Sequence, residues 1–294
     1  MKVLILGSKG QLGRCLNAQL SNEDNEVIYS TRDFIDITNF KATTKSITEI
    51  APDVIINAAA YTAVDKAEDS IEEANLINNL AIANISFICK KLNCNLIHIS
   101  TDYVFDGTST KPYLEDNITN PQSIYGKTKL KGELAIKTSG CSFVIIRTAW
   151  VYSEYGNNFL KTMLSLGADR ERLSVVGDQI GCPTYAQDIA KVINRILQRL
   201  NENQSIYGLY HFVGDTGCSW AEFAEDIFSE AIKQDILKNK PKVIRVASSE
   251  FPAKAMRPMH SRLDCSKLTK VIGIKPSSYS SGIHSAIKKL QLHI

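Results

Sequence analysis

The chain has 294 residues, about two domains at ~150 residues per domain. Its 44% hydrophobic and 22% charged residues are typical of a globular protein and exclude intrinsic disorder, a collagen repeat and a coiled coil. The net charge is only +3 and the basic residues form no single run, so we expect no nucleic-acid partner.

The N-terminal residues 1–7 contain an apolar run that is too short for a signal peptide or a membrane span. No later apolar run approaches the length of a transmembrane helix, so we expect a cytoplasmic protein with no membrane partner. Seven cysteines stand at scattered positions, without a Cys-x-x-Cys pair or a His/Cys cluster. We expect them to be reduced thiols, and they predict no metal site.

Short apolar runs alternate with helical patterns through the first half of the chain. The apolar runs predict strands at 2–6, 26–29, 53–57, 95–100 and 142–147. Helix faces are indicated by apolar residues at helical spacing, namely Leu12, Leu16 and Leu20, and later Ile77, Ala81, Asn84 and Ile88. Several strand runs do not alternate with polar residues, which is typical of strands buried on both faces. The predicted fold class is therefore α/β, with a doubly wound, parallel sheet of Rossmann type.

Beyond about residue 150 this alternation ends. Helices are predicted at 157–166, 186–200 and 220–232, and a strand at 207–213. We assign residues 1–150 to a nucleotide-binding sheet domain and 151–294 mainly to a smaller, C-terminal substrate-binding domain. Part of 186–216 is expected to return to the sheet.

Three glycines, Gly7, Gly10 and Gly13, follow the first strand and open the first helix. Glycines at such a turn allow a tight bend, close approach to a pyrophosphate and close helix–strand packing, while the helix N-terminus supplies amide donors. Their place directly after an N-terminal strand favours a dinucleotide site over a turn that merely needs glycine.

The end of the second strand bears on the choice between NADPH and NADH. No acid that could bind the ribose hydroxyls stands directly at the strand end, whereas Arg32 does stand near it. Because an arginine accommodates a 2′-phosphate, this pattern favours NADPH, with NADH still open. The alternative is that Arg32 is a solvated loop residue.

Tyr125 and Lys129 are four residues apart in a helical stretch and so share one face. A tyrosine with its ordinary pKa of ~10 is a poor acid–base catalyst at neutral pH, and a nearby ammonium favours the phenolate. The alternative is an ordinary surface pair. Thr101, at the end of the fourth strand, is placed to bond the oxygen that Tyr125 would protonate, or else caps a turn. His98, inside that strand, is expected to be a core histidine.

The glycine turn, Thr101 and the Tyr125–Lys129 pair together resemble the extended short-chain dehydrogenase/reductase superfamily. Longer strings, at 57–68, 100–107, 125–133, 147–152 and 257–263, resemble those of the dTDP-4-dehydrorhamnose reductase family. The resemblance covers nearly the whole chain. It implies NAD(P)H-dependent reduction of the C4 ketone of a dTDP-sugar substrate, dTDP-4-dehydro-β-L-rhamnose, to dTDP-L-rhamnose, which is the last step of dTDP-L-rhamnose biosynthesis.

The resemblance also implies residue roles. Tyr125 would donate the proton, Lys129 would hold the nicotinamide ribose, and Thr101 would complete the catalytic set. Together with the glycine and Arg32 arguments, cofactor contacts are expected at Gly7, Gly10, Gln11, Leu12, Gly13, Arg32, Asp36, Ile37, Ala58, Ala59, Ala60, Tyr61, Thr62, Tyr125 and Lys129. Substrate contacts are expected at Thr101, Asp102, Val104, Phe105, Trp150, Asn158, Gln179 and Arg262. Arg262 suits a diphosphate, with a structural ion pair as the alternative, and Trp150 is alternatively a core residue.

Some members of the family form magnesium-bridged dimers through an acid early in the first helix. Here Arg14 and Cys15 stand at that place. A thiol is a poor ligand for magnesium, so a Mg²⁺ role is doubtful. A homodimer is therefore left open, without support from a metal.

Other reactions and roles compete with reduction. A nucleotide-sugar dehydratase usually carries Thr-Asp-Glu at this strand end, whereas Thr101 and Asp102 are followed by Tyr103. An epimerase would have to release the ketone and present its other face. Two alternatives stay open: a non-catalytic NADP-binding subunit, like the regulatory β-subunit of methionine adenosyltransferase, and a reductase that gives the 6-deoxy-L-talose epimer.

Overall fold

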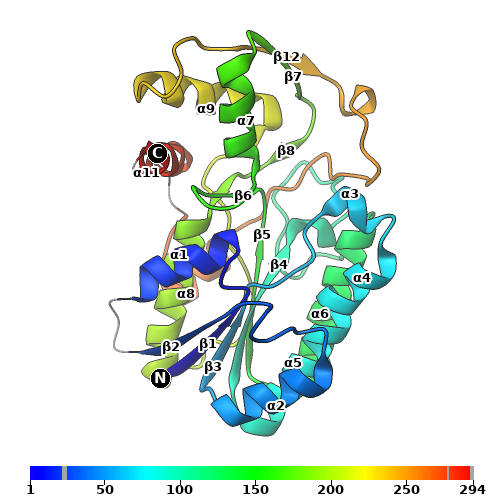
Figure 1. Cartoon of the computed structure of the whole chain (residues 1–294). Helices are drawn as coiled ribbons and strands as arrows, with labels where there is room; N and C mark the ends of the chain where they lie inside the picture. Colours follow the sequence, from blue (N-terminus) through cyan, green and yellow to red (C-terminus); the bar gives the residue numbers. More distant parts are fainter. Residues whose placement is uncertain (22–24, 277, 292–294) are drawn as a thin grey trace.

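A six-stranded parallel sheet forms the centre of the computed structural model, which describes residues 1–21, 25–276 and 278–291 (Figure 1). Its strand order is β10-β5-β4-β3-β1-β2, and all neighbours are parallel. The strands are β1 (Lys2–Leu6), β2 (Glu26–Ser30), β3 (Val54–Asn57), β4 (Asn95–Thr101), β5 (Phe143–Thr148) and β10 (Gly208–His211). The predicted α/β fold is confirmed, and each strand predicted for the sheet is found with small shifts at its ends.

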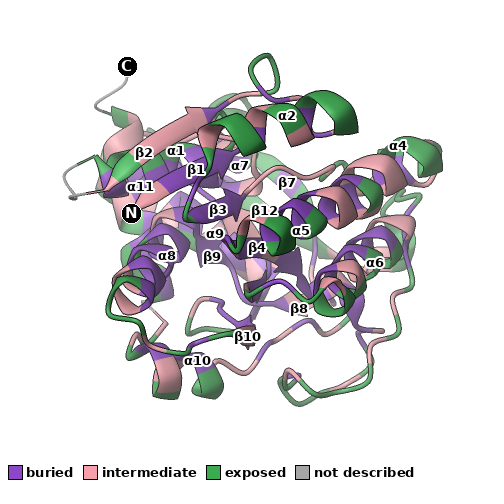
Figure 2. Cartoon of the chain, turned by 90° about the horizontal axis from the view of Figure 1, so that it is seen from below, coloured by how far each residue is buried: buried purple, intermediate pink, exposed green. Residues whose placement is uncertain are grey.

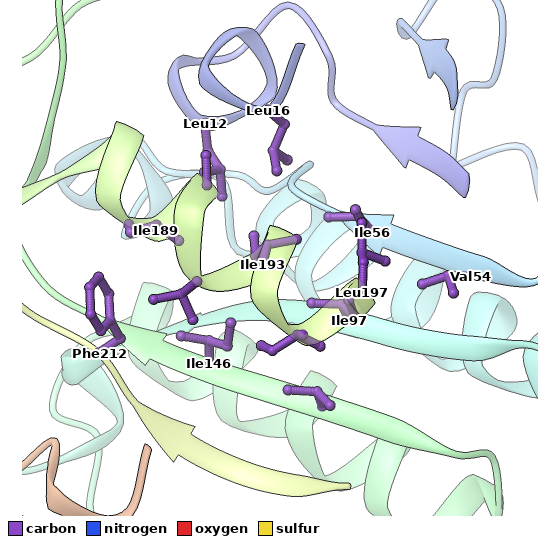
Figure 3. Close-up of a cluster of buried hydrophobic side chains, with 14 of the residues drawn as sticks. Leu12, Leu16, Val54, Ile56, Ile97, Ile146, Ile189, Ile193, Leu197 and Phe212 are labelled. Carbon is purple, nitrogen blue, oxygen red and sulfur yellow. The ribbon is translucent and has the colours of Figure 1, made fainter. Parts of the chain in front are cut away.

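Helices cover both faces of the sheet. One face carries α1 (Gln11–Leu20), α8 (Ala186–Asn201) and α10 (Ser266–Ile272), and the other carries α2 (Phe40–Ile50), α5 (Ala81–Leu92) and α6 (Ile124–Ser139). Figure 3 shows Leu12 and Leu16 of α1 beside Ile189 and Ile193 of α8, facing the strand residue Ile56. Each such side chain contributes roughly 1.5–3 kcal/mol when fully buried. Burial from both sides explains the strands' unbroken apolar runs (Figure 2).

The helix predicted through Ile77 and Ile88 is present and contains a π-helical turn. The chain passes through α3 (Val64–Ala67), α4 (Ile71–Asn75) and a π-helical turn, η1 (Leu76–Leu80), before α5 begins. A π turn has a wider repeat than an α turn, so it rotates the buried face. Ala81 and Ile88 are buried as expected, but Ile77 and Asn84 are only half-buried. Ile77, Ala81 and Ile88 nevertheless pack against one apolar core, which confirms the predicted helix.

A second layer lies beyond the carboxyl ends of the strands (Figure 1). It contains three short strand pairs: β6 (Val151–Tyr152) with β9 (Thr184–Tyr185), β7 (Arg172–Val176) with β12 (Lys242–Val246), and β8 (Ile180–Gly181) with β11 (Cys218–Ser219). Three helices, α7 (Phe159–Asp169), α9 (Trp220–Lys233) and α11 (Tyr279–Gln291), enclose its own apolar core around Phe223 and Phe228. Two short 3₁₀ turns, η2 (Asp102–Val104) and η3 (Ser248–Glu250), complete the elements.

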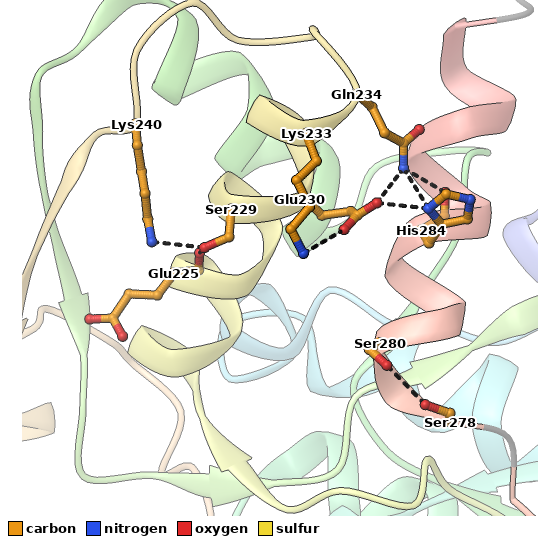
Figure 4. A network of polar contacts seen from close by, with 9 residues as sticks. All are labelled: Glu225, Ser229, Glu230, Lys233, Gln234, Lys240, Ser278, Ser280 and His284. Atoms are coloured by element: carbon orange, nitrogen blue, oxygen red, sulfur yellow. Dashed lines mark hydrogen bonds and ion pairs between the residues drawn. The ribbon is translucent and has the colours of Figure 1, made fainter.

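Polar contacts on the outer surface tie α11 to α9 (Figure 4). The Glu230 carboxylate is 2.7 Å from the His284 ring, and it accepts a 2.8 Å bond from the Gln234 amide.

Helices predicted at 157–166 and 220–232 correspond to α7 and α9, and the one at 186–200 corresponds to α8. The division into domains at residue 150 stays a prediction, although β10 does lie in the central sheet. No helix within the described ranges is long and apolar enough to cross a membrane.

Candidate active site

The candidate site lies at the carboxyl ends of β1, β3 and β4. In the strand order β1 lies between β2 and β3. The chain therefore passes from β1 to β2 on one side and then crosses over to β3 on the other side of β1. In open α/β sheets such a switch point forms the crevice where ligands bind.

The glycine turn packs against the loop after β3. Gly7 has a φ of +82°, and a Cβ there would lie 2.7 Å from the Ala59 nitrogen. A Cβ at Gly13 would lie 2.4 Å from the Gly7 carbonyl oxygen, so only glycine lets α1 come this close. Gly10 caps α1 without a side-chain bond, which leaves the first amides of the helix for another acceptor. This cradle fits a dinucleotide pyrophosphate.

Gln11 connects this turn to the second layer. Its side-chain oxygen accepts bonds from Ser153, at 3.1 Å, and from the Asn158 amide, at 2.9 Å. Asn158 also accepts from the Lys161 N–H and thereby caps α7. A residue predicted for the cofactor and one predicted for the substrate are therefore brought together. The Asn158 amide holds protein groups in this structure, and its contact with substrate stays a prediction.

Arg32 lies at the end of β2 with its side chain 72% exposed, 3.4 Å from the Asp36 carboxylate. Asp36 also accepts bonds from the hydroxyl and N–H of Thr38, at 2.7 and 3.0 Å. These bonds, with Arg32 nearby, lower the pKa of Asp36. Beside them Lys9 pairs with Asp33 at 3.2 Å. Two cations thus stand at this edge, while the neighbouring predicted contact Ile37 is buried in the core.

Asn78, which the sequence did not single out, holds the loop at 58–62. Its side-chain oxygen accepts the Tyr61 N–H at 2.9 Å, and its amide donates to the Tyr61 carbonyl at 3.1 Å and to Thr128 at 3.2 Å. It lies in the π-helical turn and is fully buried. A Cβ at Gly132 would lie 2.2 Å from the Asn78 carbonyl, so this glycine lets α6 approach. π-helical turns are frequent at functional sites, but no local sequence pattern predicts them.

Thr101, Tyr125 and Lys129 lie together, as the sequence predicts, with Thr101 at the end of β4 and the other two on α6. The Tyr125 ring packs edge-on against Tyr103, with centroids 5.4 Å apart. Burial raises the pKa of Tyr125, and its hydrogen bond with Thr101 opposes that rise. We expect the Lys129 ammonium, together with the oxidised nicotinamide ring, to favour the phenolate; in the protein alone, burial dominates the pKa of Tyr125. The phenol is protonated at neutral pH and is fit to donate a proton.

The Lys129 side chain bonds residues of β4. Its Nζ donates to the Ile99 carbonyl at 2.7 Å and lies 3.2 Å from Nε2 of His98. Burial lowers the pKa of Lys129 to about 8, with Glu133 acting in the opposite direction. His98 is fully buried and bonded at both ring nitrogens, which confirms the prediction of a core histidine.

A buried ion pair joins α6 to the sheet. Both oxygens of Glu133 bind the Arg147 guanidinium, at 2.9 and 2.7 Å, and Ser100 donates to the same carboxylate at 2.6 Å. Glu133 and Arg147 are at most 1% exposed. The pair joins α6 to β4 and β5 immediately behind the Tyr125–Lys129 face.

Asp102 is the buried carboxylate of the site. Its Oδ1 accepts a 3.0 Å bond from Thr101, and the side chain is 2% exposed. Burial raises its pKa to about 6, while bonds from Ser261 and Thr101 oppose the rise. Thr148, which pairs with Thr101 across β4 and β5, has a buried hydroxyl with no bond to another described residue. These polar groups suit a sugar.

Segment 254–263 crosses the site and is held at one point by Arg257. The guanidinium donates to the Tyr103 hydroxyl at 3.2 Å and to Asp65 at 2.5 Å. Further along, Arg262 donates to the Thr110 carbonyl, and its stem lies against Gly217. Arg262 thus bonds a backbone oxygen and not the carboxylate that the alternative of a structural ion pair requires.

Trp150 has a φ of +48°, an uncommon conformation for a bulky residue. Its ring stacks on Trp220 with centroids 3.4 Å apart, and a Cβ at Gly181 would come within 2.4 Å of it. Backbone strain of this kind costs about 1–3 kcal/mol and concentrates at functional sites.

Three other predicted substrate residues are buried. Val104 and Phe105 lie in an apolar cluster, with Phe105 stacked on Tyr113 at 4.2 Å. Gln179 is 6% exposed, between β7 and β8. The side chains of Val104 and Phe105 pack in the core, so only their backbone could reach a ligand.

The family model described as the RmlD substrate binding domain matches residues 1–292. The chain belongs to this family. A dTDP-4-dehydrorhamnose reductase of Aggregatibacter actinomycetemcomitans is 41% identical over 284 residues, which cover 96% of this chain and 97% of its own.

Two solved structures are also similar to this chain. A dTDP-4-dehydrorhamnose reductase from Clostridium acetobutylicum is 40% identical, with a TM-score of 0.92, and the match covers 99% of this chain and 100% of that one. A dTDP-4-dehydrorhamnose reductase from Bacillus anthracis in complex with NADP is 37% identical, with a TM-score of 0.91, covering 98% and 99%.

In this member of the RmlD substrate binding domain family, the position considered for a magnesium bridge holds a buried thiol. Burial, with Glu154 nearby, raises the pKa of Cys15 to about 12. Over the described parts of the chain, no group of three or more His, Cys, Asp or Glu residues is placed to hold a metal ion.

Proposed function

We propose that this protein reduces the C4 ketone of dTDP-4-dehydro-β-L-rhamnose to dTDP-L-rhamnose with NADPH. The observation that carries the proposal is the placement of Thr101, Tyr125 and Lys129 at the end of β4 and on α6, at the same edge of the sheet as the glycine cradle after β1. Membership of the family and the name shared by its relatives support the same activity.

The cofactor would lie across the switch point. The amides at the start of α1 would hold its diphosphate, the loop at 58–62 would line the cleft, and Arg32 would pair with a 2′-phosphate. The similar structure that contains NADP supports NADPH, and NADH stays open. When bound, the nicotinamide supplies the electrons that reduce the carbonyl.

Tyr125 would act as the general acid. Its buried phenol stays protonated at neutral pH and would pass its proton to the C4 oxygen as negative charge develops there. The Thr101 hydroxyl, which acts on the phenol, would orient the same oxygen. Lys129 would hold a hydroxyl of the nicotinamide ribose. To do so, it would exchange part of its present contact with Ile99 and His98 for a bond to that ribose hydroxyl.

The second layer would hold the dTDP-sugar. Asp102 would contact the sugar hydroxyls, the Trp150 ring would bound the sugar face, and Arg262 would pair with the diphosphate. The pose of the sugar decides which face of the ketone is reduced. A product with the 6-deoxy-L-talose configuration would therefore keep the mechanism and change only the pose.

The test is NADPH oxidation followed by absorbance, with enzymatically generated dTDP-4-dehydrorhamnose, and NMR of the product. Oxidation that yields dTDP-L-rhamnose supports the proposal, and the talose epimer corrects its stereochemistry. Tight NADPH binding without turnover would replace it with a regulatory NADP-binding subunit.

Two finer features belong to the same proposal. We place the enzyme in the cytoplasm, because all seven cysteines are free thiols and such thiols persist in a reducing compartment. We keep a homodimer as an expectation, to be measured by sedimentation at assay concentration.

A further inference from the structure

Three buried side chains form a continuous polar path from β3 through β4 to α6. Asn57 Nδ2 lies 3.0 Å from His98 Nδ1, and His98 Nε2 lies 3.2 Å from Lys129 Nζ. The side chains are 1%, 0% and 2% exposed. No water is needed to connect them, and each contact therefore constrains the protons of the next.

The backbone of Ala59 determines which way the Asn57 amide faces. The Asn57 oxygen accepts the Ala59 N–H at 3.3 Å, and the Asn57 nitrogen donates to the Ala59 carbonyl at 3.3 Å. Turning the amide over would set donor against donor and acceptor against acceptor at both contacts. Asn57 therefore presents an N–H to His98 Nδ1.

This orientation selects the tautomer of His98. Because Nδ1 accepts from Asn57, a neutral ring carries its proton on Nε2. The doubly protonated ring is disfavoured, since Nδ1–H would face the Asn57 amide hydrogens, and burial lowers the pKa of His98 well below its usual value. The Nε2–H then points at Nζ of Lys129.

An ammonium group has three N–H donors and no lone pair. An Nε2–H can thus be accepted by Lys129 only when its amine is neutral, while the same nitrogen still donates to the Ile99 carbonyl. We propose that Asn57 and His98 are positioning residues that favour the neutral amine of Lys129 and thereby set the pH range in which this residue changes charge. The catalytic consequence rests on the proposed reductase function.

The charges around Lys129 are consistent with this role. Glu133 on the same helix attracts a proton to Lys129, but its two oxygens are already bound by Arg147 from β5. The other titratable groups of the site are Tyr125 on α6, Asp102 and Tyr103 after β4, and Arg257, which bonds Tyr103. Burial, the largest influence, lowers the pKa of Lys129 to about 8, so both forms are present near neutral pH.

The first measurement is NMR of the full-length protein with ¹⁵N-labelled histidine, because the nitrogen shifts of an imidazole distinguish its tautomers. The resonance of His98 is the one that disappears in His98→Gln. We expect Nε2–H with an unprotonated Nδ1 in the wild type at neutral pH. Nδ1–H, or a doubly protonated ring, would overturn the proposal. This readout needs no turnover, so it is independent of the reductase assay.

The second measurement uses a variant that reverses the hydrogen bond between residue 57 and His98. In Asn57→Asp a carboxylate accepts both from Ala59 and from the ring, so His98 should switch to Nδ1–H and present a lone pair to the Lys129 ammonium. The pKa of Lys129 should rise, and the corresponding limb of the kcat–pH profile should move up by about one unit or more. An unchanged tautomer, or an unchanged profile with a switched tautomer, would contradict the proposal.

The negative charge that Asn57→Asp introduces is controlled by a double variant. Asn57→Asp combined with His98→Gln keeps the carboxylate and removes the ring. If the shift runs through the ring, it is lost in the double variant, and if it is the charge alone, it persists and the proposal fails. If either variant does not fold, the wild-type tautomer alone still decides the matter.

Discussion

The two walls of the candidate site are built differently. The wall formed by β1, β3, β4 and α6 consists of neighbouring strands of the central sheet and the helix packed on them, and its polar side chains are buried and bonded to one another, as with Asn57, His98 and Lys129. The wall formed by residues from 150 onward contains two-residue strands, a strained Trp150 and an aromatic stack. The first wall thus has geometry determined before any ligand binds, and the second depends on packing between distant loops.

The largest effect should come from the first wall. Tyr125→Phe removes the proposed acid and should lower turnover by ~10²–10⁴-fold, with little change in NADPH affinity. Steady-state kinetics and NADPH titration measure the two quantities. Tyr103→Phe is the matched control, because it removes the neighbouring hydroxyl, which bonds Arg257. Near-normal turnover of Tyr125→Phe would exclude the phenol as the acid.

The buried ion pair of the first wall should dominate stability. Glu133→Gln leaves the Arg147 charge uncompensated at 1% exposure, and should lower the free energy of unfolding by about 3–5 kcal/mol in urea denaturation. Glu225→Gln, in the second layer, breaks the 3.1 Å pair with the half-exposed Arg245 and should cost less than about 1 kcal/mol. Equal losses of unfolding free energy in the two variants would mean that ion pairs contribute equally to stability in the two regions.

Asp102 lies between the walls and gives a pH-dependent prediction. Its folded pKa of about 6 is above the unfolded value, so its charge opposes folding as the pH rises from about 4 to above 6. Asp102→Asn should therefore be more stable than the wild type by about 2–3 kcal/mol at pH 7, with the difference vanishing below pH ~4. Urea unfolding at several pH values measures this. A variant that is less stable at pH 7 would show that the carboxylate is compensated.

Much of the first wall could be predicted from the sequence because its signals are local. A strand–glycine–helix string and a tyrosine and lysine one turn apart are patterns within a few residues, and the structure brings them together. In the protein alone the pKa of Tyr125 is raised by burial, which depends on the whole fold and which no pattern within a few residues shows. Asn78 escaped prediction because a π turn has no local signature, and the Arg257–Asp65 contact joins residues far apart in the chain.

The aromatic stack tests the second wall. Trp220→Ala removes the ring on which Trp150 lies, and an aromatic pair contributes about 0.5–1.5 kcal/mol beyond its buried area. The KM for the dTDP-sugar should rise by up to about tenfold, while the dissociation constant of NADPH stays the same. Trp220→Phe keeps a ring and should show a smaller change. A loss of NADPH affinity in Trp220→Ala would mean that the second wall also holds the cofactor.

The smallest expected effect is at the exposed end of β2, next to the first wall. Arg32 is 72% exposed and already paired with Asp36, so a 2′-phosphate would gain a partly screened contact, and Arg32→Ala should weaken NADPH by only a few-fold, roughly 0.5–1 kcal/mol. NADH, which lacks that phosphate, should bind unchanged. Lys9→Ala, equally exposed and paired with Asp33, is the matched control. Equal weakening of both cofactors by Arg32→Ala would mean that Arg32 only stabilises the loop after β2, and a selective loss in Lys9→Ala instead would move the 2′-phosphate contact to Lys9.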